Sequence, residues 1–243
     1  MKNCPYPLSR NLFLLSVFAV AMGILEAIVV VYLRQMYYPQ GFYFPLTLLS
    51  QKMMITEWIR EIMTLVMLVS LGMISGKDSF QRFLFFLYIF AVWDIFYYAG
   101  LKLFLNWPVS FFTFDVLFLI PVPWISPVLA PLLCSMTMIL FSVSMLVLRE
   151  KGLSVCLLKR EWGLAFTGVM LTFCSFIWDY TAIVIKNGFI LNILSLPEND
   201  PFWKRLSQYQ PVEYHWSLFA AGELLVVYVF FRVLKRCKNK SFK

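Results

Sequence analysis

Six long apolar stretches dominate this chain of 243 residues and restrict the folds it can adopt. Each is long enough for a transmembrane α-helix, which needs about 20 mostly apolar residues. The stretches are continuous rather than alternating, which excludes a membrane β-barrel. Only 14% of the residues are charged, whereas a soluble domain has about 25%. We therefore predict an all-α, polytopic membrane helix bundle that forms one domain, residues 1–243. The six predicted transmembrane helices are 11–33, 53–75, 82–105, 128–148, 163–186 and 216–234.

Most lysine and arginine residues lie at one set of span ends. In the six-span topology, 14 lie on the side of the two termini and six on the opposite side. Cytoplasmic loops carry the excess of positive residues, so we expect both termini and the link 149–162 to be cytoplasmic. This flanking pattern explains the net charge of +8 without nucleic acid as a partner. The lipid bilayer is the expected partner, and the sequence leaves the oligomeric state open.

A seventh span over 109–125 is the competing topology. It would place the N-terminus outside, with a charge split of 13 to 7 that is hardly worse. The stretch contains Asp115, Pro121 and Pro123, however, and prolines also stand at 108 and 127. Non-helical backbone at membrane depth persists only where it is buried in protein or lines a cavity. We therefore predict a re-entrant or interfacial segment at 109–125 that does not cross the membrane.

Carboxylates inside the predicted spans are the strongest indication of a functional site. Ionisable groups are costly in hydrocarbon and mark binding sites or proton pathways. With a rise of 1.5 Å per residue, most of these acids lie within about 10–12 Å of the non-cytoplasmic interface, and helical spacing places several on shared faces. We therefore expect one polar layer in the outer half of the bilayer. The candidate ligand-binding or proton-carrying residues are Glu26, Glu57, Arg60, Glu61, Asp94, Tyr98, Lys102, Asp179 and Glu223.

The acids outnumber the embedded Arg60, so ion pairs, protonated acids or a bound cation must balance their charge. We expect Arg60 to pair with Glu57 or with a carboxylate of another span. A hydrogen bond between Asp94 and Tyr98 would be a purely structural use of those residues. A hard cation is a further alternative. Its candidate ligands are Glu61, Asp94, His215 and Glu223, and no motif identifies a cofactor or a catalytic residue.

Three non-cytoplasmic loops, 37–45, 106–131 and 187–216, are rich in aromatic residues and proline. Tryptophan and tyrosine favour the headgroup level, and these loops are too apolar to be solvated linkers. We expect them to form a lid over the outer face of the bundle. Asp200-Pro201 predicts a short surface helix over 201–209.

Three segments resemble a family of small multi-span membrane proteins of bacteria. They are GILEAIVVVYLR at 23–34, WDIFYYAGLKLFLNWP at 93–108 and FDVLFLIPVPWISPVLAP at 114–131. The resemblance covers about half of the chain. It implies a multi-pass protein of the bacterial plasma (inner) membrane that forms one structural unit. It implies no activity and no catalytic residue.

Three functions fit these features, and whether the protein is an enzyme stays open. A one-sided polar site under a lid favours binding or processing of a lipid-linked or small polar ligand at the outer leaflet. In the enzymatic form, paired acids would transfer protons and Arg60 with Lys102 would hold a phosphate. A proton- or cation-coupled transporter of a small solute is the second function, although the cytoplasmic half lacks a polar path. A non-catalytic assembly partner is the third.

Overall fold

The computed structural model describes residues 7–47, 49–186 and 208–241 of the chain. Within these residues, six helices are long and apolar enough to cross a membrane. They are α1 (Leu8–Tyr37), α2 (Gln51–Ser75), α3 (Ser79–Leu105), α4 (Leu129–Glu150), α5 (Lys159–Lys186) and α7 (Trp216–Ser241). The predicted all-α membrane bundle is therefore confirmed, and the structural helices extend the predicted spans by a few residues. The predicted helix over 201–209 falls largely outside the described residues.

Local sequence signals define several helix ends. Ser50 precedes α2, and its hydroxyl accepts a hydrogen bond from the Met53 amide. Asp78 precedes α3, and its carboxylate accepts from the amides of Phe80 and Gln81. Asn106 ends α3 in the left-handed conformation, with φ of 52°. Such caps satisfy backbone groups that a helix end leaves without partners.

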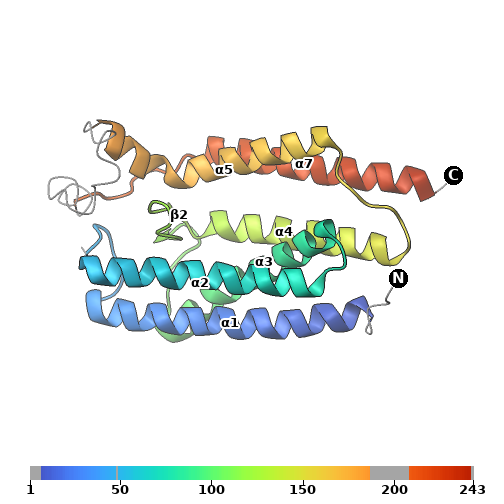
Figure 1. Ribbon diagram of the computed structural model, residues 1–243. Helices are drawn as coiled ribbons and strands as arrows, with labels where there is room; N and C mark the ends of the chain where they lie inside the picture. The colour runs from blue at the N-terminus through green and yellow to red at the C-terminus, as the bar shows by residue number, and fades with distance from the viewer. Residues whose placement is uncertain (1–6, 48, 187–207, 242–243) are drawn as a thin grey trace.

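The helices form two groups on either side of α4 (Figure 1). On one side α3 packs against α1, α2 and α4, and on the other side α5 packs against α7. Close contacts between helices depend on glycine. A Cβ atom at Gly23 of α1 would lie 2.6 Å from the Trp93 carbonyl oxygen, and one at Gly168 of α5 would lie 2.7 Å from the Gly222 carbonyl oxygen. Small residues allow this close approach of helix backbones in membranes.

The chain starts α1 and finishes α7 at the same end of the bundle, which we call the terminal end (Figure 1). The half of the bundle next to it has an apolar core. That core includes Leu15, Ala19, Leu68, Leu84, Phe85, Ile89, Met145, Leu146, Val229 and Val233.

A short β-hairpin joins α3 to α4 at the opposite end, which we call the hairpin end. Its strands β1 (Phe114–Val116) and β2 (Ile125–Pro127) pair antiparallel, with Asp115 opposite Ser126. Beyond the strands, the Leu117 amide donates to the Trp124 carbonyl at 2.8 Å. The hairpin thus satisfies part of its own backbone, as non-helical chain inside a bundle must.

The hairpin is inserted among the helices. The Phe118 ring lies 6.5 Å from the Phe90 ring and 6.1 Å from the Trp93 ring, centroid to centroid, and both partners are near the middle of α3. No helix forms between residues 106 and 128. The seven-span alternative is therefore not seen, and the segment 109–125 has the re-entrant form that its prolines predict.

Candidate functional site

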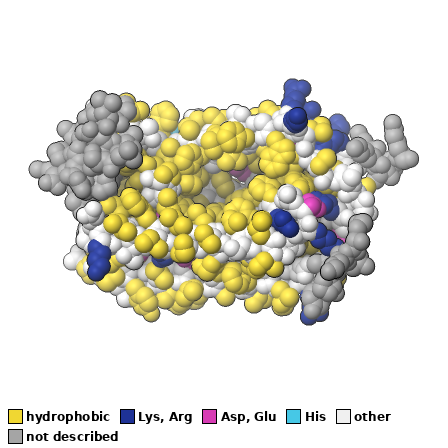
Figure 2. All heavy atoms as spheres, in the orientation of Figure 1, with side chains coloured by type: hydrophobic (Ala, Val, Ile, Leu, Met, Phe, Trp, Pro, Cys, Tyr) yellow, Lys and Arg dark blue, Asp and Glu magenta, His cyan; other side chains and the backbone are white. Residues whose placement is uncertain are grey.

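A cavity of about 240 Å³ lies between the hairpin and the helices. Helices α1, α2, α3, α4 and α5 all contribute to its wall. In the space-filling view, the face of the molecule is hollowed between α2 and α5 (Figure 2). The charged side chains that line the cavity are Glu26, Glu57, Glu61, Asp94, Asp115, Arg34 and Arg60. Five carboxylates thus face two guanidinium groups, so the wall is negatively charged when all of them are ionised.

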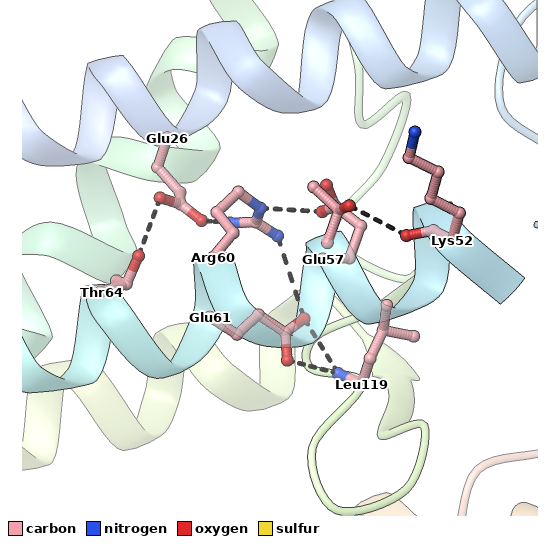
Figure 3. A network of polar contacts seen from close by, with 8 residues as sticks. Glu26, Lys52, Glu57, Arg60, Glu61, Thr64 and Leu119 are labelled. Atoms are coloured by element: carbon pink, nitrogen blue, oxygen red, sulfur yellow. Dashed lines mark hydrogen bonds and ion pairs between the residues drawn. The ribbon is translucent and has the colours of Figure 1, made fainter.

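Arg60 is the centre of one polar cluster in this wall (Figure 3). Its Nε donates to Glu57 Oε2 at 2.8 Å, and its Nη2 lies 3.9 Å from Glu61 Oε1. Its Nη1 forms an ion pair with Glu26 of α1. The Thr64 hydroxyl donates to the other oxygen of Glu26 at 3.2 Å. The predicted pairing of Arg60 is confirmed, both with Glu57 and with a carboxylate of another helix.

Helical spacing explains how α2 presents this cluster. Its buried residues are Glu57, Glu61, Thr64, Leu68 and Gly72, which follow one another at three- or four-residue intervals. Such residues form one stripe on a helix. Glu57 and Glu61 of this stripe line the cavity, and Leu68 belongs to the apolar core near the terminal end.

Glu61 also holds the re-entrant hairpin. The Leu119 amide donates to both carboxylate oxygens of Glu61, at 3.0 and 2.9 Å (Figure 3). A charged acceptor strengthens such a bond, because a carboxylate binds an amide more strongly than a neutral carbonyl does. One side chain therefore connects the Arg60 cluster to the chain segment that closes the cavity.

Arg34 and Asp115 form a second, separate ion pair at the hairpin end. Arg34 Nη2 lies 3.0 Å from Asp115 Oδ1, and the two side chains are only 8% and 2% exposed. The Arg34 guanidinium carbon lies 4.3 Å from the centroid of Phe42 and 3.8 Å from that of Trp107. The Tyr98 hydroxyl donates to Asp115 Oδ2 at 3.3 Å. These contacts fix Arg34 in one orientation.

Asp94 has a different partner from the one expected. The Ser135 hydroxyl of α4 donates to Asp94 Oδ2 at 2.8 Å, whereas Tyr98 bonds to Asp115. The structural alternative, a hydrogen bond between Asp94 and Tyr98, is therefore not seen. The reason is that the hairpin brings in a second carboxylate, which the spacing on α3 alone does not reveal.

Of the nine candidate residues, six line the cavity: Glu26, Glu57, Arg60, Glu61, Asp94 and Tyr98. The other three do not. The Lys102 ammonium donates to the carbonyls of Asn106 and Pro108 on the exposed surface, so it does not join Arg60 in holding a phosphate. Asp179 accepts a hydrogen bond from Tyr209. Glu223 accepts hydrogen bonds from Thr137 and Cys134, and only Cys134 of these three lines the cavity.

The four candidate metal ligands do not all lie in one place. Glu61 and Asp94 share the cavity, whereas the His215 ring packs against Trp178 with centroids 4.7 Å apart. Within the described part of the chain, no group of three or more His, Cys, Asp or Glu side chains has the arrangement to hold a metal ion.

Arg34, Asp115 and Ser135 also line the cavity, although none of them is among the nine candidate residues. Arg34 lies inside the last turn of α1 and is buried. The signal for Asp115 was present, since it is a lone carboxylate in an apolar, proline-rich stretch.

Comparison with protein-family models, with curated proteins and with solved structures finds no match to this chain.

Proposed function

We propose that this multi-pass membrane protein binds a lipid-linked or small polar ligand in the cavity at the hairpin end. The observation that carries the proposal is the charged wall of that cavity, with five carboxylates and two arginines held in place by ion pairs and hydrogen bonds. Binding sites are concave, with a few oriented polar groups in a largely apolar wall. Charged groups inside a membrane bundle mark such sites.

The hairpin end is proposed to face the outside of a bacterial plasma membrane. The positive-inside rule supports this orientation, because the terminal end carries the excess of lysine and arginine. The resemblance to a bacterial membrane family supports the location. The hollow between α2 and α5 would open sideways toward lipid, which suits a ligand with an acyl or prenyl chain.

Binding is favoured over transport by the other half of the bundle. A transported polar solute needs polar groups along its whole path, and its site lies near the bilayer midplane. The half next to the terminal end is instead filled by an apolar core, with Leu68, Phe85 and Met145 at most 1% exposed. A site open to one side fits binding or processing at that side.

A cavity-filling variant tests the proposal. Met138 lines the cavity, and Met136, two residues away on α4, is 52% exposed. Met138→Trp should fill part of the cavity, whereas Met136→Trp should only change the lipid-facing surface. A ligand present at 100 times its Kd stabilises a protein by about 2.7 kcal/mol. We expect a membrane extract, tested as lipid and water-soluble fractions, to raise the Tm of the wild type and of Met136→Trp but not of Met138→Trp.

Equal shifts in Tm for the two tryptophan variants would contradict the proposal, because the stabilising ligand would then bind elsewhere. The absence of any shift in the wild type with either fraction would contradict it as well.

A further inference from the structure

We propose that the ligand of this cavity is a zwitterion with an ammonium group and an anionic phosphate or carboxylate group. The ammonium group binds at Asp94 and the anionic group binds at Arg34. This inference rests on the proposed function and names the chemical class of the ligand. It follows from two features of the cavity wall. Arg34 has a buried hydrogen-bond donor without an acceptor among the described residues, and Asp94 has no cationic partner among them.

The demand for an anion comes from Arg34. The side chain is 8% exposed and lines the cavity, and its Nη2 is used by Asp115. Its Nη1 is buried without a hydrogen-bond acceptor among the described residues. A buried donor left without a partner costs about 1–3 kcal/mol, more when it is charged. The rings of Phe42 and Trp107, which are nearly perpendicular to each other, both contact the guanidinium and limit its turning toward another acceptor. A phosphate or carboxylate oxygen satisfies this donor best.

Two tryptophans add a demand for oxygen atoms along the ligand. Trp93 and Trp124 both line the cavity and both pack against Phe118, at centroid distances of 6.1 and 5.3 Å. Their indole Nε1 atoms are buried and have no acceptor in the described part of the chain. An indole N–H is a donor only, so ester, hydroxyl or phosphate oxygens of a ligand would satisfy both.

The demand for a cation comes from Asp94. The Ser135 hydroxyl donates to it at 2.8 Å, and no lysine or arginine in the described ranges forms an ion pair with it. Arg60 is already shared by Glu26, Glu57 and Glu61. An ammonium group at Asp94 would balance the negative charge of its ionised carboxylate.

The aromatic wall beside Asp94 favours the same cation. The rings of Trp93 and Tyr97, on its own helix, lie 6.4 Å apart and nearly parallel, and both residues line the cavity. Aromatic faces attract ammonium groups, with about 2 kcal/mol or more when the pair is removed from water. An alkyl ammonium ion therefore suits this place better than a hydrated metal ion.

Asp94 and Arg34 belong to one connected part of the cavity wall. Asp94 and Tyr98 are one turn apart on α3, which is about 6 Å along the helix axis. Tyr98 bonds to Asp115, and Asp115 bonds to Arg34. A phosphate and an ammonium group joined by two carbon atoms, as in phosphoethanolamine, are a simple zwitterion of this class. The headgroup of a phospholipid and a free amino compound share this chemistry.

The test compares three probes on the purified full chain in detergent. Lyso-phosphatidylethanolamine carries both charges and an acyl chain, lyso-phosphatidylglycerol lacks the ammonium group, and glycerophosphoethanolamine lacks the acyl chain. We expect the first to bind at least about 10-fold more tightly than the second, a difference of one charged contact. Tight binding of glycerophosphoethanolamine would identify a free solute as the source, whereas binding only of the lyso-lipid would identify a lipid headgroup.

Two variants test which residue binds the ammonium group and which binds the anionic group. Asp94→Asn should lower the affinity for lyso-phosphatidylethanolamine to that of lyso-phosphatidylglycerol, and the control Asp179→Asn, outside the cavity, should leave the ratio unchanged. Arg34→Lys keeps the charge beside Asp115 and loses the guanidinium fork. It should lower the affinity for both lyso-lipids by about 10-fold and leave the ratio of the two affinities unchanged.

Equal affinity of the wild type for the two lyso-lipids, or an unchanged ratio in Asp94→Asn, would overturn the zwitterion. If no probe binds while the membrane extract still stabilises Met136→Trp and not Met138→Trp, the proposed function stands and the zwitterion fails. If the extract does not distinguish the two tryptophan variants either, both proposals fail.

Discussion

At the scale of single residues, Arg60 alone pairs with three carboxylates of the cavity wall. Three carboxylates from two helices surround one guanidinium group whose side chain is 21% exposed. A buried ion pair adds little net stability, but removing one partner leaves an uncompensated charge and is costly. Arg60 is therefore needed mainly to compensate the charge of three carboxylates inside the bundle.

We expect Arg60→Met to lower the free energy of unfolding by about 3–5 kcal/mol. Adding Glu26→Gln should recover part of the loss, because one stranded charge is removed. The control is Arg149→Met, which breaks an ion pair with the 46% exposed side chain of Asp78 and should cost at most about 1 kcal/mol. Thermal unfolding in detergent measures all three, and similar losses for Arg60→Met and Arg149→Met would contradict the account.

Asp78 lies outside the spans and should contribute to acid sensitivity. Burial raises the pKa of its carboxyl, but hydrogen bonds from Arg149 and from the Gln81 amide outweigh this, so the pKa lies below the ordinary 3.8. Because the folded-state pKa is lowered, the contribution to stability is present above 3.8 and is lost as the pH falls through the folded-state value. The Tm of Asp78→Asn should therefore fall less on acidification than that of the wild type. Parallel curves of Tm against pH would show that the pair has no such role.

At the scale of elements, the contact between α5 and α7 depends on a pair of glycines. A Cβ atom at Gly222 would lie 2.5 Å from Thr172 Oγ1 and 2.6 Å from the Gly168 carbonyl oxygen. The second neighbour is backbone, so the helices themselves would have to move apart. Membrane helices associate through such close packing, because lipid supplies no hydrophobic force between them.

Gly222→Ala should lower the Tm by several degrees, corresponding to about 1–3 kcal/mol of overpacking. Gly163 is the matched control, because a Cβ atom there meets no heavy atom within 4 Å. Gly163→Ala should leave the Tm unchanged or raise it, since alanine favours a helix by up to about 1 kcal/mol. A Gly222→Ala protein as stable as Gly163→Ala would contradict the packing seen here.

The helices could be predicted from the sequence, whereas the contacts between distant segments could not. Apolar length was enough to find the six long helices of the described residues, and Asp115 with the prolines of 108–127 argued against a seventh span. Helical spacing brought Glu57 and Glu61 to one face. The insertion of the hairpin among the helices could not be predicted, because its contacts, such as that from Leu119 to Glu61, join segments 58 residues apart without any shared pattern.

The layer of acids was predicted only in part for the same reason. Depth along each span correctly grouped Glu26, Glu61 and Asp94. Depth alone says nothing about which helix lies next to which, and α5 and α7 pair with each other on the far side of α4. Asp179 and Glu223 are therefore not among the cavity residues.

At the scale of the whole molecule, an even number of spans brings the start of α1 and the end of α7 to one side. We expect that side to be cytoplasmic, because it carries 14 of the lysine and arginine residues. In a cysteine-free background, a cysteine at position 78 should react with a membrane-impermeant reagent only after the cells are opened. A cysteine at position 43, where Tyr43 is 54% exposed, should react in intact cells. The reverse pattern would invert the orientation.

The central claim is that the cavity at the hairpin end holds a ligand. The most direct test is a cryo-electron microscopy structure of the full chain purified with its native lipids. We predict non-protein density in the cavity within hydrogen-bond distance of both Asp94 and Arg34. A cavity that contains only isolated waters, or that is closed by a direct contact between Arg34 and Asp94, would contradict the claim.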